Sequence, residues 1–145
     1  MAKHIKLRNG FTVYKKEIYF NGIRQNIEYP KTFEILGCYY CKDEKYIYSG
    51  DKKIVEADAN TFTVLDWSYA KDNFRVYYYN NVIKGANPKF FEILSNDDYA
   101  KDNNSVYYLG KKINDSDPNT FILLEDGKAK DKNNNYLNGE IVEKK

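Results

Sequence analysis

The sequence has few of the residues that enzymes use for nucleophilic catalysis and metal binding. Its 145 residues include one His, His4, and two Cys, Cys38 and Cys41. A nucleophile needs a neighbouring base, and a structural zinc site needs about four nitrogen or sulfur ligands. The few serines fall at turn or solvent-facing positions, with no second His to activate them. We therefore expect a protein that is not an enzyme and has no bound metal or cofactor.

Clustered basic residues and long apolar runs are also missing. Arg occurs only at Arg8, Arg24 and Arg75, and the 23 basic residues are interspersed with 21 acidic ones, for a formal net charge of +2. Nucleic-acid binding depends on grouped cations that neutralise phosphates, so no nucleic-acid partner is expected. No stretch approaches the roughly 20 apolar residues of a membrane span, and the charged N-terminus lacks a signal-peptide core. A cytoplasmic protein without a membrane partner is expected.

Aromatic residues, in contrast, are frequent. The chain has 15 Tyr and 8 Phe, and aromatic residues make up 17% of the sequence. Tyr, Phe, Val, Ile and Thr favour strands, whereas Asn, Asp and Gly favour turns. No helical periodicity of useful length occurs. The composition predicts an all-β protein with short strands and many turns.

A unit of about 29–30 residues is repeated along the chain. A Lys-Asp phrase recurs at residues 42–43, 71–72, 101–102 and 130–131. A Phe-containing phrase recurs with the same period, beginning at Thr32, Thr61, Phe90 and Thr120. These phrases divide one domain, 1–145, into an N-terminal capping hairpin, four repeats and a truncated copy, at 1–12, 13–41, 42–70, 71–100, 101–129 and 130–145.

Each unit carries the signals of short strands joined by tight turns. Phe33 and Ile35 would lie on one strand face and Glu34 on the other. Asn-Gly pairs at 9–10, 21–22 and 138–139 predict type I′ hairpin turns. One unit cannot bury its apolar face alone, so neighbouring units must stack. We expect tandem antiparallel β-hairpin repeats stacked as a meander or solenoid, with a closed ring or small barrel as the alternative.

The Cys38-Tyr39-Tyr40-Cys41 segment has the spacing of a redox or metal motif. A thioredoxin-type motif opens a helix, whereas this one lies between two expected strands. In the repeat, Cys41 occupies the position of Ala70, Ala100 and Ala129. The alignment therefore indicates a small, buried packing position for Cys41.

The Asp131-x-Asn133-x-Asn135 segment resembles the beginning of a calcium-binding loop. It lacks the Gly at the sixth position and has Val142 where the loop requires Glu. Other repeats have ordinary turn-forming residues at the same place, such as Asp102 and Asn103. The interpretation is a turn rather than a metal site.

One Tyr recurs in each unit, and in four of the five units it follows an apolar β-branched residue (Ile18, Ile47, Val76 or Val106). If the apolar neighbour is in the core, strand alternation points the Tyr outward, where a stripe of Tyr would suit a protein interface. The alternative is a ladder packed on neighbouring hairpins, with hydroxyls at the solvent. Residues at which the units differ would add specificity. The Tyr column comprises Tyr19, Tyr48, Tyr77, Tyr107 and Tyr136; the candidate partner-binding residues are Tyr48, Tyr77, Tyr107, Tyr136, Trp67, Phe74 and Arg75.

The recurring Tyr-Ala-Lys-Asp, Val-Tyr-Tyr and Asp-Pro-x-Thr-Phe phrases resemble the DKNYY family of bacterial repeat proteins over residues 13–142. Residues 1–12 lie outside the resemblance. The unit at 42–70 departs from the pattern, with Ser49-Gly50 in place of a second Tyr. The resemblance implies a repeat architecture and a bacterial source, but no particular reaction.

These features favour a non-enzymatic binding protein whose partner is another protein. A small chain with an aromatic surface would suit a bacterial immunity or inhibitor protein that neutralises a toxin domain. The alternative is a cell-surface or carbohydrate-binding repeat module, in which Tyr rings stack on sugars.

Overall fold

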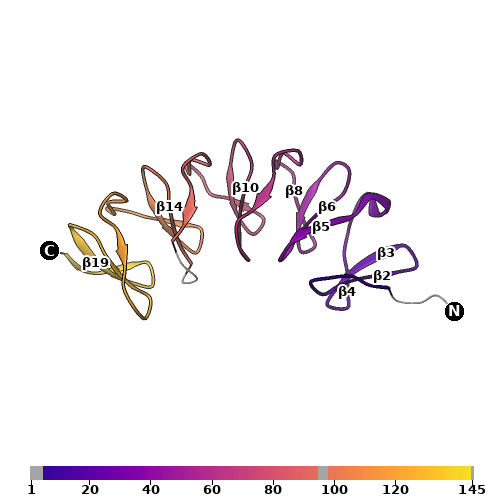
Figure 1. Cartoon of the computed structure of the whole chain (residues 1–145), viewed down its shortest axis with the longest axis horizontal. Coiled ribbons are helices and arrows are strands. Elements are labelled where there is room, and N and C mark those ends of the chain that lie inside the picture. The colour runs from indigo at the N-terminus through magenta and orange to yellow at the C-terminus, as the bar shows by residue number, and fades with distance from the viewer. Residues whose placement is uncertain (1–4, 95–97, 145) are drawn as a thin grey trace. The chain divides into compact units, whose positions relative to one another are not determined.

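The computed structural model describes residues 5–94 and 98–144. In this part of the chain, twenty short strands form five antiparallel sheets of four strands each (Figure 1). The described residues include one 3-10 turn, η1 (Pro30–Thr32), and no α-helix. No helix in these ranges is long and apolar enough to cross a membrane. None of the five sheets closes into a barrel, and the predicted antiparallel hairpin repeats are confirmed.

The chain divides into two compact units, Met1–Asn73 with Tyr79–Asn81, and Phe74–Tyr78 with Val82–Lys145. Each sheet contains four strands that are consecutive in the chain. The first sheet consists of β1 (Ile5–Lys6), β2 (Phe11–Tyr14), β3 (Glu17–Phe20) and β4 (Ile23–Arg24). The second consists of β5 (Glu34–Gly37), β6 (Tyr40–Lys42), β7 (Ile47–Ser49) and β8 (Lys52–Ile54).

The remaining sheets repeat this pattern. The third consists of β9 (Thr63–Val64), β10 (Tyr69–Lys71), β11 (Val76–Tyr78) and β12 (Asn81–Val82). The fourth consists of β13 (Glu92–Ile93), β14 (Tyr99–Lys101), β15 (Val106–Tyr108) and β16 (Lys111–Ile113). The fifth consists of β17 (Ile122–Leu123), β18 (Lys128–Lys130), β19 (Asn134–Leu137) and β20 (Glu140–Lys144).

The Asn-Gly hairpins form as predicted. Asn9 and Gly10 both have positive φ, at 56° and 81°, as a type I′ turn requires. Across this turn Ile5 pairs with Val13. Asn138 and Gly139, with φ of 48° and 80°, join β19 to β20 in the same way.

Consecutive sheets within a unit pack face to face. In the first unit, Phe11 and Ile18 of the first sheet belong to one buried cluster with Ile35, Cys41 and Tyr48 of the second. The second unit has the same arrangement, with β14 and β19 in neighbouring sheets (Figure 1). Its buried cluster contains Tyr99, Val106, Ile113, Phe121, Ala129 and Tyr136. Neighbouring repeats therefore share a core, which a single unit could not form alone.

Two glycines allow adjacent sheets of the second unit to approach closely. Gly110 has φ of 73°, and a Cβ on it would lie 2.4 Å from Cβ of Tyr78. Gly139 has φ of 80°, and its Cβ would lie 2.6 Å from Cβ of Tyr108. Only glycine combines this conformation with so little space.

The sheets group the strands in a different phase from the Lys-Asp boundaries of the sequence repeat. Residues assigned to an N-terminal hairpin, 1–12, supply β1 and the beginning of β2 of a full four-stranded sheet. The segment 130–145 supplies β19 and β20, which complete the fifth sheet. A repeated sequence does not show where one structural repeat ends and the next begins. Hydrogen bonding between strands decides which four strands form one sheet.

Candidate functional site

The Tyr column lies inside the protein. Tyr48, Tyr77 and Tyr107 have 0% of their surface exposed, and Tyr136 has 1%. The expectation that these four residues form an exposed stripe is therefore wrong. Strand alternation correctly separates Ile47 from Tyr48, but both residues are buried, because stacked sheets cover both faces of the strand.

The hydroxyls of Tyr48, Tyr107 and Tyr136 turn inward rather than toward solvent. Each donates a hydrogen bond to the Asp of the Lys-Asp phrase, which lies five residues earlier in the chain. The Oη–Oδ2 distances are 2.7 Å for Tyr48–Asp43, 2.9 Å for Tyr107–Asp102 and 2.6 Å for Tyr136–Asp131. The Tyr column and the Lys-Asp phrase of the sequence are thus the two partners of one repeated interaction.

Each of these Asp side chains joins three segments of the chain. Asp102 Oδ1 accepts hydrogen bonds from the amides of Asn104 and Ser105, at 2.7 and 2.8 Å. Its Oδ2 accepts from Tyr107 and from the amide of Asn87, in the preceding linker. The carboxylate therefore fixes its own turn, the next strand and the linker that enters the sheet.

The calcium-like segment belongs to this same arrangement. Asp131 Oδ1 accepts hydrogen bonds from the amides of Asn133 and Asn134, at 2.7 and 2.8 Å. Its Oδ2 accepts from the amide of Asp117 as well as from Tyr136. The segment is a turn held by its first residue, so the predicted turn is confirmed.

Burial and hydrogen bonding have opposite effects on the carboxylates of this set. Burial raises the pKa of Asp43 and Asp131, but the bonds from Tyr48 or Tyr136 and from backbone amides outweigh it, so each pKa is lowered. On the phenol side, burial followed by the hydrogen bond to Asp102 raises the pKa of Tyr107 to about 12. Asp43 and Asp131 are therefore carboxylates beside neutral phenols, and both groups of each pair are closed to solvent.

Cys41 occupies the small core position predicted from the repeat. It is fully buried, as are Ala70 and Ala100 at the equivalent positions. Burial, followed by the charge of Asp43, raises the pKa of the Cys41 thiol to about 12. Cys38 is half-buried in the preceding turn, and both thiols are free. Among residues 5–94 and 98–144, no group of three or more His, Cys, Asp or Glu side chains gathers to hold a metal ion.

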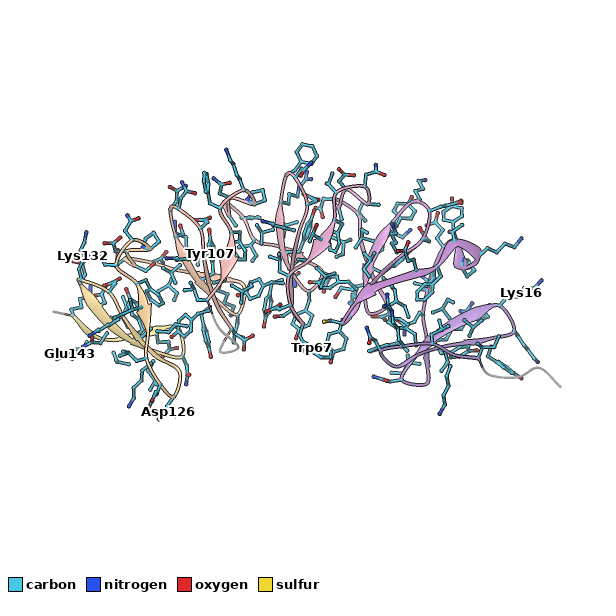
Figure 2. All side chains as sticks on the ribbon, in the orientation of Figure 1. Lys16, Trp67, Tyr107, Asp126, Lys132 and Glu143 are labelled. Carbon is cyan, nitrogen blue, oxygen red and sulfur yellow. The ribbon has the colours of Figure 1, made fainter. Side chains whose placement is uncertain are left out.

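Trp67 is exposed at the turn that leads into β10, with 64% of its surface open to solvent (Figure 2). Its ring lies 6.0 Å from that of Tyr39, which lies 6.0 Å from Tyr79 and 5.6 Å from Phe20. We call Phe20, Tyr39, Trp67 and Tyr79 the aromatic cluster; all four belong to the first unit. Of these, the sequence singled out only Trp67. The others occupy turns or strand ends whose proximity depends on sheet stacking.

Hydrogen bonds hold the turns that present the aromatic cluster. Asp66 Oδ1 accepts from the amides of Ser68 and Tyr69, at 2.8 and 2.5 Å, and so fixes the turn around Trp67. Tyr40, from the second sheet, donates its hydroxyl to Ser68 O at 2.6 Å, with Tyr79 O at 3.1 Å. One buried phenol therefore ties together the turns that carry Trp67 and Tyr79.

The other two candidate residues lie in the second unit. Phe74 is 68% exposed, and Arg75 is half-buried next to it, immediately before β11. Of the seven candidates, four are buried in the repeat cores. Trp67 lies at the surface of the first unit, and Phe74 and Arg75 lie at the surface of the second.

Comparison with known proteins agrees with the repeat. No curated protein and no solved structure matches the chain. The sequence matches the model of the DKNYY family over residues 6–111 and 99–145. The match begins at residue 6, within the N-terminal segment 1–12 that lay outside the sequence resemblance. This is expected if the first sheet is one of the repeats. This chain belongs to the DKNYY family.

Proposed function

We propose that this chain is a non-enzymatic protein-binding repeat domain, and that its partner docks on the aromatic cluster of the first unit. The observation that carries the proposal is the exposure of Trp67 among three other aromatic residues. Large aromatic side chains are enriched at the centres of protein interfaces, where their burial supplies much of the binding energy. A single exposed Trp is unremarkable, but Trp67 contacts Tyr39, which in turn contacts Tyr79, so Trp67 is part of a patch.

The rigidity of the supporting turns strengthens this proposal. Asp66 and Tyr40 fix the two turns that carry Trp67 and Tyr79. A surface that is already ordered loses less conformational entropy when a partner binds. The buried Tyr and Asp residues would thus form the scaffold, and the cluster would form the binding surface.

The orientation of the rings favours a protein partner over a carbohydrate. Tyr39 is inclined at 65° to Trp67 and at 60° to Tyr79. Rings inclined in this way do not present one flat platform on which a sugar chain can stack. They do offer ridges and recesses that side chains of a protein can fill. A toxin domain neutralised by an immunity or inhibitor protein is the form of this function that we propose first.

Photocrosslinking in the source cells tests the proposal. A photoreactive phenylalanine analogue at position 67 should give a protein adduct, whereas the same analogue at Val55, also highly exposed, should not. With the adduct identified, Trp67→Ala should weaken its binding by at least about tenfold, since interface Trp residues commonly contribute 2 kcal/mol or more. Trp67→Ala should leave the melting temperature unchanged. Equal crosslinking from both positions, or a glycan adduct, would argue against the proposal.

A further inference from the structure

A groove lies beside the first sheet, separate from the aromatic cluster. Its walls are Leu7 before β2, Val13 and Ile18 on β2 and β3, and Pro30 and Phe33 around η1. Lys16 and Lys31 complete the lining. The volume is about 380 Å³, enough for one or two apolar side chains. All seven residues belong to the first unit.

The groove exists because one repeat position is occupied differently in the first sheet. Val13 occupies the strand position that is Lys in the other four sheets, at Lys42, Lys71, Lys101 and Lys130. In the fourth sheet, Lys101 Nζ donates a hydrogen bond to Pro118 O at 3.3 Å, and Pro118 is buried. Pro30 follows Val13 at the same distance along the chain as Pro118 follows Lys101. Val13 cannot donate a hydrogen bond to Pro30, and Pro30 is only half-buried. The first sheet therefore has an opening where the lysine side chain would lie.

The two charged residues that line the groove are both lysines. A hollow on the far side of Pro30 and Lys31 adds Glu28, which pairs with Lys53, and Glu44. Lys16 and Lys31 are exposed and come from two different elements, the β2–β3 hairpin and η1 (Figure 2 labels Lys16). An adjoining hollow shares Leu7 and Phe33 and adds Lys6, Arg8 and Glu34. The Glu34 carboxylate is paired with Lys42 at 3.3 Å. An apolar floor with cationic rims is complementary to an apolar group flanked by carboxylates.

The hairpin that carries Lys16 has an unusual backbone. Lys15 and Lys16 have φ of 51° and 68°, so both adopt the left-handed conformation of a type I′ turn. The equivalent conformations at 9–10, 21–22 and 138–139 are occupied by Asn-Gly, which adopts them with less strain. Strain of this kind gathers at functional sites, and here it fixes a lysine at the end of the groove.

We propose that this groove, the Val13 groove, binds an acidic segment of a partner protein. One apolar side chain of the segment enters between Leu7, Val13 and Phe33. Carboxylates on either side of it pair with Lys16 and Lys31. Cations on two elements suit a peptide with charges at both sides of its anchor, rather than an amphiphile with a single head group.

Peptide selection on the full chain tests this assignment. A phage-displayed dodecapeptide library is selected against the protein, and the enriched peptides are titrated by fluorescence anisotropy. The enriched peptides should carry Asp or Glu on both sides of Leu, Ile or Phe. Val13→Lys, which restores the residue of the other four sheets and should leave the fold intact, should weaken their binding at least about tenfold.

The remaining variants separate the charges from the apolar floor. Lys16→Glu with Lys31→Glu should weaken binding by about tenfold or more, and peptides with Lys in place of their acidic residues should recover it. Trp67→Ala should have no effect, so the test is independent of the aromatic cluster. Enriched peptides without acidic residues, or equal affinity for the Val13→Lys chain, would overturn the proposal. Binding of octanoate in the groove without binding of acidic peptides would also overturn it.

Discussion

The buried Tyr–Asp hydrogen bond is an interaction that recurs from one repeat to the next. The Asp accepts hydrogen bonds from the phenol of its own sheet, from the amides of its own turn and from an amide of the preceding linker, as Asp102 does. Hydrogen bonds to a charged group are stronger than those between neutral groups. A buried donor left without an acceptor carries a large desolvation penalty. These two facts explain why Tyr and Asp recur together in the sequence.

Removal of one phenol should show the strength of a pair. Tyr107→Phe keeps the ring and removes the hydroxyl that Asp102 accepts. The free energy of unfolding should fall by about 1.5–3 kcal/mol, the usual contribution of a hydrogen bond to a charged group. Tyr108→Phe, at the neighbouring half-buried position, should change it by less than about 0.5 kcal/mol. Urea unfolding of both variants makes the comparison, and equal losses would contradict the assigned role.

At the scale of strands and sheets, side-chain polarity distinguishes inner from outer faces. The inner face of the fourth sheet has Tyr99, Val106 and Ile113 in the shared core. The corresponding face of the fifth sheet has Lys128, Asn135 and Glu143 (Figure 2 labels Glu143). Asn135 Nδ2 donates to Glu143 Oε2 at 2.7 Å, so this face satisfies its own polar groups. The face is therefore polar where the matching face of the fourth sheet is apolar.

This difference between faces can be reversed by mutation. Lys128→Tyr, Asn135→Val and Glu143→Ile together would give the fifth sheet the side chains of an inner face. The triple variant should form larger assemblies than the wild type, because it exposes an apolar sheet face that can pack on another molecule. Light scattering after size-exclusion chromatography measures the mass. Lys128→Arg serves as the control, and an unchanged mass for the triple variant would show that the face does not limit association.

Strands and turns could be predicted from the sequence because their signals are local. The Asn-Gly hairpins follow from residues next to one another in the chain, and the small position of Cys41 follows from aligning the units. The exposure of the Tyr column could not be predicted in this way. Alternation places Ile47 and Tyr48 on opposite faces, but whether a neighbouring sheet covers the second face depends on stacking between units.

The candidate sites show the same limit. Trp67 differs visibly from its repeat equivalents, but its contact with Tyr39, and that of Tyr39 with Tyr79, depends on how the sheets stack. The Val13 groove had a sequence signal, since Val13 replaces a Lys found in four other sheets. That signal can be interpreted only from the fourth sheet, where the lysine at this position, Lys101, donates a hydrogen bond to Pro118 O.

In the molecule as a whole, buried tyrosines form a scaffold, and a small aromatic cluster lies at the surface. Seven of the 15 tyrosines are fully buried: Tyr40, Tyr48, Tyr69, Tyr77, Tyr99, Tyr107 and Tyr136. For Tyr107, burial raises the pKa to about 12. A phenol whose pKa is higher in the folded state stabilises the fold fully below its unfolded pKa of about 10. It loses that contribution as the pH rises through the folded value.

Spectrophotometric titration of tyrosinate, followed together with circular dichroism, tests whether the buried tyrosines form this scaffold. The seven buried tyrosines should ionise only well above the ordinary pKa of about 10, cooperatively and together with loss of the β-sheet signal. Ionisation of all 15 near the ordinary pKa, in a chain that stays folded, would contradict the account.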